Sequence, residues 1–398
     1  MERFGGDENM TIGEIMEKLE IRMERMIRLQ PEKKRLYFDK LKSKFDSRAI
    51  LLYGPRGVGK TTFLLSVARE NDMLYISGDD PLLLQHNFAE IGEEILTNYS
   101  GIIIDEVHFL KDWSLTVKTL YDSFPNKKLW LSDSSSIILR KGIADLSRRF
   151  VTKKLPIMSL REYIYFETGK ELPVISSPFE PGSLEEVSNL IREVDIMKYF
   201  REYKTHGTRP FYIEGNYPER MKNIIEKSLY YDILHLVGSV SENHIRLMKS
   251  LISYLIFSKI PTVNIESMCK EWGVGKPKLY ELLNALEEIE LINIVRYKGI
   301  EKPYSKGAKI FLADPTAYQI YEGEVGNFRE AFIVSMLKEI GNIYASKDET
   351  KADFIFNDIK LEIGGKSKRR KSSDFVIRDD IDIPLKNMIP LWTFGMLW

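Results

Sequence analysis

A glycine-rich run that ends in lysine and threonine follows the first strongly apolar segment of the chain. It reads Gly54-Pro55-Arg56-Gly57-Val58-Gly59-Lys60-Thr61, and Thr62 continues it into a helical pattern. In such a loop the glycines let backbone N–H groups wrap around phosphates, and the helix N-terminus adds a favourable dipole. We expect Lys60 to contact the β- and γ-phosphates and the Thr61 hydroxyl to bind Mg²⁺. The run therefore predicts a site for ATP with Mg²⁺.

Two acidic residues follow the apolar segment Ile102–Ile104. Asp105 stands at the carboxyl end of this expected strand, where open α/β sheets bind their ligands. We expect Asp105 to hold Mg²⁺ together with Thr61, and Glu106 to polarise the attacking water as a general base. An ordinary acidic strand cap has the same sequence, but its coincidence with the glycine-rich loop favours ATP hydrolysis over binding alone.

Hydroxyl and arginine side chains further along could complete the site. Ser132 or Ser134, at the tip of the next strand, could sense the γ-phosphate, although a hydroxyl-rich turn has the same sequence. We take Ser134 as the candidate. Arg148 and Arg149 precede a further strand, and one of them could act as an arginine finger across a contact between subunits. We take Arg149 as the candidate, with surface arginines at a helix end as the alternative.

Short apolar runs must position these residues. The runs are Ala49–Tyr53, Met73–Ile76, Ile102–Ile104 and Leu129–Leu131. Because turn residues flank them and helical patterns separate them, they predict an α/β P-loop NTPase with a parallel sheet sandwiched by helices. Before them, residues 11–47 predict a charged amphipathic helix with a break near Pro31, and after them Pro173–Gly182 has the composition of a linker.

Residues 246–315 predict a winged helix-turn-helix. Its parts are a helix over Leu247–Phe257, a short helix capped by Asn264, a turn at Gly273, a third helix from Lys276, and strands over Leu291–Tyr297 and Lys309–Leu312. Lys276, Lys278 and Tyr280 on the third helix would enter the major groove of double-stranded DNA, and Lys298, Lys302 and Lys306 would form a wing along the phosphates. Use for packing or protein contacts is the alternative, because several glutamates share the third helix.

The last 70 or so residues predict a small α/β domain. A helix around Phe328–Ile340 precedes four strands, over Ile343–Ala345, Asp353–Phe356, Lys360–Ile363 and Ser373–Ile377. Glu330, Asp353, Glu362 and Lys366 resemble the PD-(D/E)xK nuclease layout, in which two acids bind Mg²⁺ and a lysine assists the attacking water. Here the lysine lies four residues after the second acid, beyond two glycines, so we favour a retained scaffold over an active nuclease. The basic run Lys366–Lys371, with Lys368, Arg369 and Arg370, is a candidate for phosphate binding or an ordinary solvated loop.

The sequence as a whole resembles the prokaryotic AAA-type ATPases, frequent in archaea, that join an ATPase core to an uncharacterised C-terminal region. The similar segments are Gly54–Thr62, Ile104–Trp113, Ser132–Ser135, Ser147–Phe150, Leu155–Phe166 and Ile389–Trp398. The resemblance implies an ATPase fold with a lid, related to origin-recognition and signalling ATPases. Two departures stand out: Arg148 replaces the family's glycine before the arginine, and Asp133 replaces a glycine and adds negative charge near the phosphates, which could weaken hydrolysis.

Composition sets further bounds. The 398 residues suffice for two or three domains, and the 58 basic and 58 acidic side chains give no bulk charge that would indicate nucleic acid. A single cysteine excludes an internal disulfide, and the five histidines show no ligand spacing, so we expect no structural zinc site. No signal peptide or membrane span is recognisable, and we expect a cytoplasmic protein.

These patterns predict five segments. They are an N-terminal helical segment over 1–48, the P-loop AAA-type core over 49–172, a helical lid over 183–245, the winged helix over 246–324 and the nuclease-like domain over 325–398. Our leading hypothesis is an ATPase that couples ATP hydrolysis to DNA, and that works as a homo-oligomer if the arginine acts in trans. The alternatives are a nucleotide-dependent switch that recruits proteins without DNA, and an ATP-gated nuclease.

Overall fold

The structure is a computed structural model of the chain. It describes residues 10–134, 146, 148–180, 183–233, 237, 240–258, 264–299, 308–348, 350–366 and 372–398, except the side chain of Leu184. The chain divides into two compact units, Met1–Pro156 and Ile157–Trp398. Within the described residues, no helix combines the length and the apolar character that a membrane span requires.

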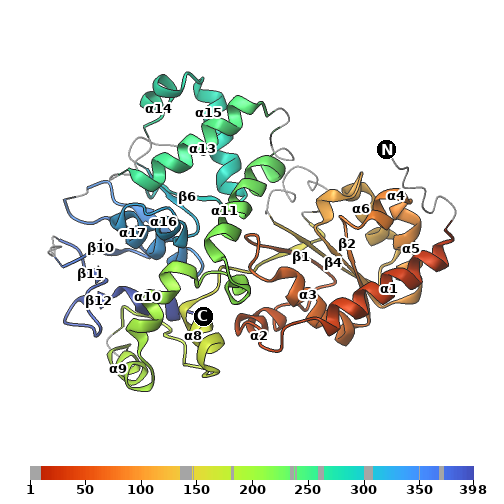
Figure 1. Cartoon of the computed structure of the whole chain (residues 1–398), viewed down its shortest axis with the longest axis horizontal. Helices are drawn as coiled ribbons and strands as arrows, with labels where there is room; N and C mark the ends of the chain where they lie inside the picture. Colours follow the sequence, from red (N-terminus) through yellow and green to blue (C-terminus); the bar gives the residue numbers. More distant parts are fainter. Residues whose placement is uncertain are drawn as a thin grey trace. The chain divides into compact units, whose positions relative to one another are not determined.

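A five-stranded parallel sheet forms the centre of the first unit (Figure 1). Its strands are β1 (Ala49–Tyr53), β2 (Met73–Ser77), β3 (Gly101–Asp105), β4 (Lys128–Asp133) and β5 (Val151–Lys154), in the order β2-β3-β4-β1-β5. The four apolar runs of the sequence are thus confirmed as strands. Because β1, β3 and β4 are central and parallel, the glycine-rich loop after β1 and the acids after β3 meet at one edge of the sheet.

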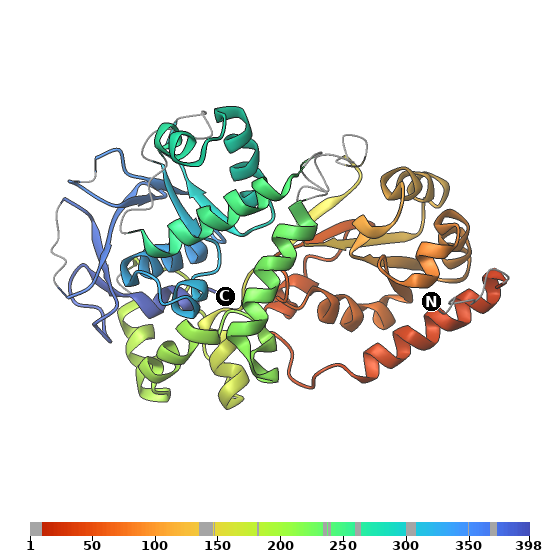
Figure 2. The same ribbon diagram turned by 45° about the horizontal axis from the view of Figure 1, so that its top comes forward.

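Helices cover both faces of this sheet, with α3 on one side and α6 on the other (Figures 1 and 2). The helices are α1 (Ile12–Arg28), α2 (Tyr37–Lys42), α3 (Lys60–Ala68), η1 (Arg69–Asn71), α4 (Pro81–Gln85), α5 (Phe88–Asn98), η2 (Val107–Phe109) and α6 (Trp113–Ser123). Thr11 and Glu14 form a capping box that starts α1, and the chain leaves the helix before Pro31, as expected. Arg35, from the segment between α1 and α2, donates to the carbonyl of Val58 at 3.0 Å and so supports the glycine-rich loop.

The second unit begins with helices. They are α8 (Leu160–Thr168), α9 (Ser183–Glu193), α10 (Ile196–His206), η3 (Pro210–Glu214), α11 (Tyr217–Lys227) and the π-helix η4 (Ser228–Asp232). Residues 157–172, grouped with the ATPase core by sequence, lie in this unit. The physical reason is their packing: Tyr163 of α8 contacts Tyr203 of α10, and Ser159 donates to the carbonyl of Trp398 at 3.1 Å. The predicted segment boundaries stay predictions.

Three helices and an antiparallel hairpin follow in the order expected. They are α13 (Glu242–Phe257), α14 (Ile265–Trp272), α15 (Lys276–Glu288), β6 (Ile292–Val295) and β7 (Lys309–Leu312). Asn264 caps α14 by accepting from the Ser267 N–H at 3.1 Å, and Gly273 has the left-handed backbone that its turn requires. Lys302 and Lys306, expected at the tip of the hairpin, lie outside the described residues.

A mixed sheet with the order β12-β11-β10-β9-β8 completes the second unit. Its elements are α16 (Thr316–Ile320), α17 (Val325–Leu337), β8 (Ile343–Ala345), β9 (Phe354–Phe356), β10 (Ile359–Gly364), β11 (Phe375–Arg378), β12 (Met388–Pro390) and η5 (Leu391–Met396). The four expected strands are present, and β12 is an addition that pairs in parallel with β11. Lys368, Arg369 and Arg370 lie outside the described residues.

Candidate nucleotide site

The glycine-rich loop is shaped by close backbone contacts. Gly54 has φ +151°, and a Cβ atom there would lie 2.2 Å from the carbonyl oxygen of Leu155, so only glycine fits. Gly57 and Gly59 have φ of 76° and 99°, values that side chains disfavour. The loop then enters α3 at Lys60. The glycines therefore allow a tight loop without Cβ atoms directly before the N-terminus of α3, an arrangement that suits a phosphate group.

Lys60 is folded back over this loop. Its side chain is buried, and its ammonium donates to the carbonyls of Gly54 at 2.7 Å and Pro55 at 3.3 Å. Burial lowers the pKa of Lys60, while the negative charges of Glu106, Asp105 and Asp133 oppose that shift. A phosphate group offers stronger acceptors than these carbonyls do, so Lys60 is positioned to exchange them for phosphate oxygens.

Asp105 accepts hydrogen bonds from three hydroxyl groups. Its Oδ2 accepts from the Thr61 hydroxyl at 2.6 Å and from the Tyr75 hydroxyl at 2.8 Å, and its Oδ1 accepts from Ser132. The residue is 2% exposed. A buried carboxylate beside hydroxyl oxygens is the donor set of a hard cation such as Mg²⁺, so Thr61 and Asp105 fit the metal role expected of them. Tyr75 was not anticipated; its signal is the one hydroxyl within the apolar residues Met73–Ile76.

Glu106 follows Asp105 with a left-handed backbone, φ 48°, which turns its side chain away from the strand direction. One carboxylate oxygen, Oε1, lies 3.5 Å from the Arg56 guanidinium, and the other, Oε2, lies 3.6 Å from His108 Nδ1. Burial raises the pKa of Glu106, and the charges of Lys60 and Arg56 partly oppose this shift. A carboxylate with a raised pKa next to the phosphate loop suits a general base.

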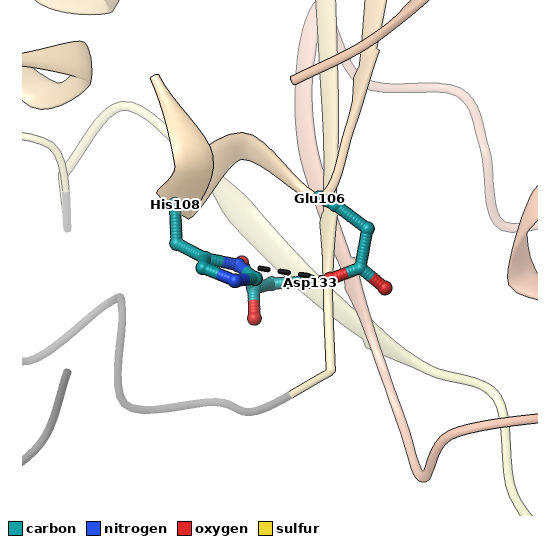
Figure 3. A group of neighbouring side chains, drawn as sticks. All are labelled: Glu106, His108 and Asp133. Carbon is teal, nitrogen blue, oxygen red and sulfur yellow. Dashed lines mark hydrogen bonds and ion pairs between the residues drawn. The ribbon is translucent and has the colours of Figure 1, made fainter. Parts of the chain in front are cut away.

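Figure 3 shows Glu106, His108 and Asp133 pointing toward one another. His108 lies on η2 and Asp133 at the end of β4, and His108 Nδ1 is hydrogen bonded to Asp133 Oδ2 at 2.7 Å. Their side chains are 6% and 1% exposed. Spacing along the sequence could not reveal this pair because the two residues come from different elements, 25 positions apart. His108 is thus a direct partner of Asp133, one of the acidic side chains whose charge acts on Lys60.

The remaining candidates of this unit, a serine and two arginines, have different surroundings. Ser134 is buried at the tip of β4, with its hydroxyl 3.4 Å from Asp133 Oδ1, whereas Ser132 contacts Asp105 directly. Arg149 makes a two-pronged ion pair with Asp122, at 3.1 and 2.9 Å, that anchors it to α6. Arg148 is exposed. The structure therefore gives Arg149 a role inside its own unit and leaves Arg148 accessible.

Comparison with known proteins agrees with this geometry. Residues 46–164 match the family model described as an AAA domain. The chain contains an AAA-type P-loop ATPase domain. The matched residues include the glycine-rich loop, Asp105, Glu106 and the His108–Asp133 pair. No curated protein matches the chain.

Several solved structures share features with the chain at low identity. The Walker-type ATPase PABY2304 of Pyrococcus abyssi is 15% identical, with a TM-score of 0.42, and the match covers 74% of this chain and 97% of that one. The RuvB Holliday junction branch migration motor of Thermotoga maritima is 17% identical, with a TM-score of 0.30 and coverages of 78% and 95%. The Aeropyrum pernix Orc1 protein in complex with DNA is 12% identical, with a TM-score of 0.29 and coverages of 78% and 91%. These superpositions are too loose to transfer any property to this chain.

Outside the AAA domain, the candidate DNA-contacting residues lie on α15. Lys276 is exposed, and Lys278 and Tyr280 are partly exposed. Both lysines have acidic partners: Lys276 pairs with Glu266 at 3.0 Å and Lys278 with Glu281 at 2.9 Å. Lys298, expected in the wing, pairs with Asp358. Positive charge on this face is therefore partly neutralised.

The four nuclease-type candidates differ in their partners and exposure. Glu330 pairs with Lys309 at 3.0 Å, Asp353 accepts from the Ile363 N–H at 2.8 Å, and Lys366 is exposed. Glu362 is fully buried within β10. Among the described residues, the group of three or more side chains close enough to hold a metal ion is Glu106, His108 and Asp133, not these acids.

Proposed function

We propose that the chain binds ATP with Mg²⁺ in its AAA domain and hydrolyses it. The observation that carries this proposal is the 2.6 Å hydrogen bond between Thr61 and Asp105, which joins the helix after the glycine-rich loop to the end of β3. Lys60 and Glu106 interact electrostatically with Asp105 and with each other, so the groups proposed to bind phosphate, to hold the metal and to act as the general base are neighbours.

Each side chain has a defined task in this proposal. The loop N–H groups and Lys60 bind the phosphates, with Lys60 exchanging the Gly54 and Pro55 carbonyls for phosphate oxygens. Thr61 and Asp105 would hold Mg²⁺, which supplies positive charge to the transferring phosphoryl group. Glu106 orients the attacking water and accepts its proton, a role that requires the ionised carboxylate. Ser134 stays the proposed γ-phosphate sensor.

Two substitutions separate binding from hydrolysis. Lys60→Ala removes the phosphate-binding charge, so the affinity for a fluorescent ATP analogue should fall by about 100-fold or more, since charge-assisted contacts to phosphate are among the strongest hydrogen bonds. Glu106→Gln should keep that affinity but reduce phosphate release by about 100- to 1,000-fold, as expected when a general base is lost. Lys111→Ala, which changes an exposed lysine of the same unit, is the control and should affect neither. Tight ATP binding by Lys60→Ala would contradict the site.

We also propose that ATP turnover is coupled to double-stranded DNA. The support is the order of elements α13, α14, α15, β6 and β7, which is that of a winged helix with α15 as its recognition helix. Lys276, Lys278 and Tyr280 would then face the duplex, and the segment with Lys368, Arg369 and Arg370 would add phosphate contacts. The acidic partners on and near α15 predict weak binding that fades as salt rises.

Duplex binding at low salt tests this coupling. A double Lys276→Gln and Lys278→Gln variant should bind more weakly, and the slope of log affinity against log salt should fall by roughly two, about one for each lost phosphate contact. Arg246→Gln, an exposed basic residue on α13, serves as the control for general charge effects. If wild type neither binds duplex nor changes its ATPase rate with DNA, the nucleotide-dependent protein switch becomes the better proposal.

Two further points complete the proposal. An arginine that acts on a neighbouring subunit must be accessible, so Arg148 suits that role better than Arg149, which Asp122 holds. Among the described residues, Glu330, Asp353 and Glu362 do not form a group of three ligand atoms close enough for one metal ion, which argues against an ATP-gated nuclease. Plasmid cleavage with Mg²⁺ or Mn²⁺ that disappears in Glu362→Gln would restore that alternative.

A further inference from the structure

We propose that Glu106, His108 and Asp133 form a second cation site in the AAA domain, which takes a transition-metal dication such as Zn²⁺ and stops hydrolysis when filled. The three side chains offer one ligand atom each, and these atoms all lie within 4.8 Å of one another. Glu106 directly follows β3, His108 lies on η2, and Asp133 is the last residue of β4 (Figure 3). The site is distinct from the Mg²⁺ ligands Thr61 and Asp105.

Two of the distances between the ligand atoms can be compared with those around such an ion. Zinc binds imidazole nitrogen and carboxylate oxygen at about 2.0–2.2 Å, which places the ligand atoms of a tetrahedral site about 3.4 Å apart. His108 Nδ1 and Glu106 Oε2 are already 3.6 Å apart. His108 Nδ1 and Asp133 Oδ2, at 2.7 Å, form a hydrogen bond that must open by about 0.7 Å to reach that spacing.

Charge and burial favour the same ion. Two carboxylates and a neutral imidazole balance the charge of a dication, and His108 and Asp133 are almost wholly buried. Glu106 Oε2 is buried and accepts no hydrogen bond from the residues that the structure describes, while Oε1 faces Arg56. Three protein ligands leave a fourth position for water.

The imidazole decides which metal is preferred. Nitrogen ligands suit Zn²⁺, Co²⁺ and Cu²⁺, whereas Mg²⁺ prefers an all-oxygen set such as that around Thr61 and Asp105. The two sites would therefore sort cations by chemistry although they lie at the same sheet edge. Affinity at the second site should follow the usual order for these divalent ions, in which Cu²⁺ binds more tightly than Co²⁺ or Zn²⁺.

Filling this site would remove the base without removing the nucleotide. A Glu106 carboxylate that ligates a metal can no longer accept a proton from water, while Lys60, Thr61 and the loop stay available to ATP. This part of the inference rests on the proposed role of Glu106 in hydrolysis. The expected effect is inhibition that lowers kcat and leaves the affinity for ATP almost unchanged.

Metal titration of the full chain without nucleotide tests the site itself. Calorimetry with Zn²⁺, and visible absorption with Co²⁺ as a tetrahedral reporter, should show one site in wild type. His108→Gln and Asp133→Asn should each weaken it at least tenfold, while His86→Gln, which changes another histidine of the same unit, should leave it intact. Thermal melting confirms that each variant is folded. Binding that is unchanged in both ligand variants would overturn the proposal.

Steady-state turnover at saturating ATP and Mg²⁺ tests the consequence. Zn²⁺ should inhibit wild type, a chelator selective for zinc should restore the rate, and His108→Gln should need at least tenfold more Zn²⁺ for the same fractional inhibition of its own rate. Equal inhibition of wild type and His108→Gln would overturn the regulatory role. A wild type that binds Zn²⁺ but shows no ATP turnover at any metal concentration would instead refute the proposed hydrolysis, so the two failures are distinguishable.

Discussion

Asp105 and Glu106 in the first unit, and Asp353 and Glu362 in the second, are acidic pairs on or beside β-strands with different partners. Asp105 accepts hydrogen bonds from the hydroxyls of Thr61, Tyr75 and Ser132. Asp353 instead accepts one from the backbone N–H of Ile363, within the sheet. A hydroxyl can rotate and offer its oxygen to a cation, whereas a backbone N–H is fixed and has no lone pair to share.

This difference explains why only the first pair forms a candidate site. Hydroxyl partners leave Asp105 able to exchange hydrogen bonds for a metal ion while Thr61 follows it to the same ion. The Ile363 N–H that bonds to Asp353 Oδ2 has no oxygen to offer, so it cannot join this carboxylate in binding a metal ion. Acid content alone therefore does not indicate a metal site; the chemistry of the neighbouring donors decides.

The largest expected effect comes from neutralising one acid of each pair. Asp105→Asn removes the charge that would hold Mg²⁺, and we expect ATP turnover to fall by about 100- to 1,000-fold, as when other preorganised electrostatic groups are removed from active sites. Glu362→Gln, an isosteric change at a fully buried acid of the second unit, should leave turnover unchanged. Phosphate release at several Mg²⁺ concentrations measures both. Equal losses in the two variants would erase the distinction drawn between the pairs.

A smaller effect concerns the pH dependence of turnover. Burial raises the pKa of Glu106, and the base must be ionised, so turnover should fall as the pH drops through this raised pKa, about tenfold for each unit below it. The acid limb of the profile should therefore lie above that of an ordinary glutamate. Glu106→Gln should lack this limb in its residual rate. A profile whose limb does not respond to this change would show that another group controls the rate.

Neighbouring charges allow the same limb to be shifted in both directions. Arg56→Gln removes a positive charge that lowers the pKa of Glu106, so the limb should move to higher pH. Asp133→Asn removes a negative charge that raises this pKa, and the limb should move to lower pH. Rate profiles in zinc-free buffer, compared with wild type, give the sign of each shift. Shifts in the same direction would contradict the charge arrangement around Glu106.

Much of the nucleotide site follows from the sequence because its parts are local. The glycine-rich loop and the Asp105-Glu106 pair each occupy a few consecutive residues, and the four apolar runs predict the sheet that joins them. Parallel strands bring their carboxyl ends to one edge, so the contact between Thr61 and Asp105 could be expected without coordinates.

The rest depends on contacts between distant elements. The His108–Asp133 hydrogen bond joins η2 to β4, and the Arg149–Asp122 pair reaches back to α6. Side-chain partners of this kind depend on sheet order and rotamers, neither of which leaves a spacing pattern in the sequence. The same reason applies to α8. Its residues directly follow the strands of the ATPase core in the sequence, but they pack on α10 and the C-terminus in the second unit.

The smallest expected effect comes from removing one tyrosine hydroxyl in each unit. Tyr75→Phe keeps the buried ring and removes the 2.8 Å hydrogen bond to Asp105. Losing one such bond costs about 1 kcal/mol, which corresponds to a roughly fivefold lower apparent affinity for Mg²⁺ during turnover. The matched change is Tyr217→Phe, whose hydroxyl bonds to Thr208 at 2.7 Å and Thr316 at 3.2 Å in the second unit. It should lower thermal stability by a similar free energy and leave the Mg²⁺ dependence of turnover unchanged. If Tyr75→Phe instead lowered only the thermal stability and left the Mg²⁺ dependence unchanged, the Tyr75 hydroxyl would contribute to packing rather than to the site. The contrast between the two acidic pairs would then rest on Thr61 and Ser132.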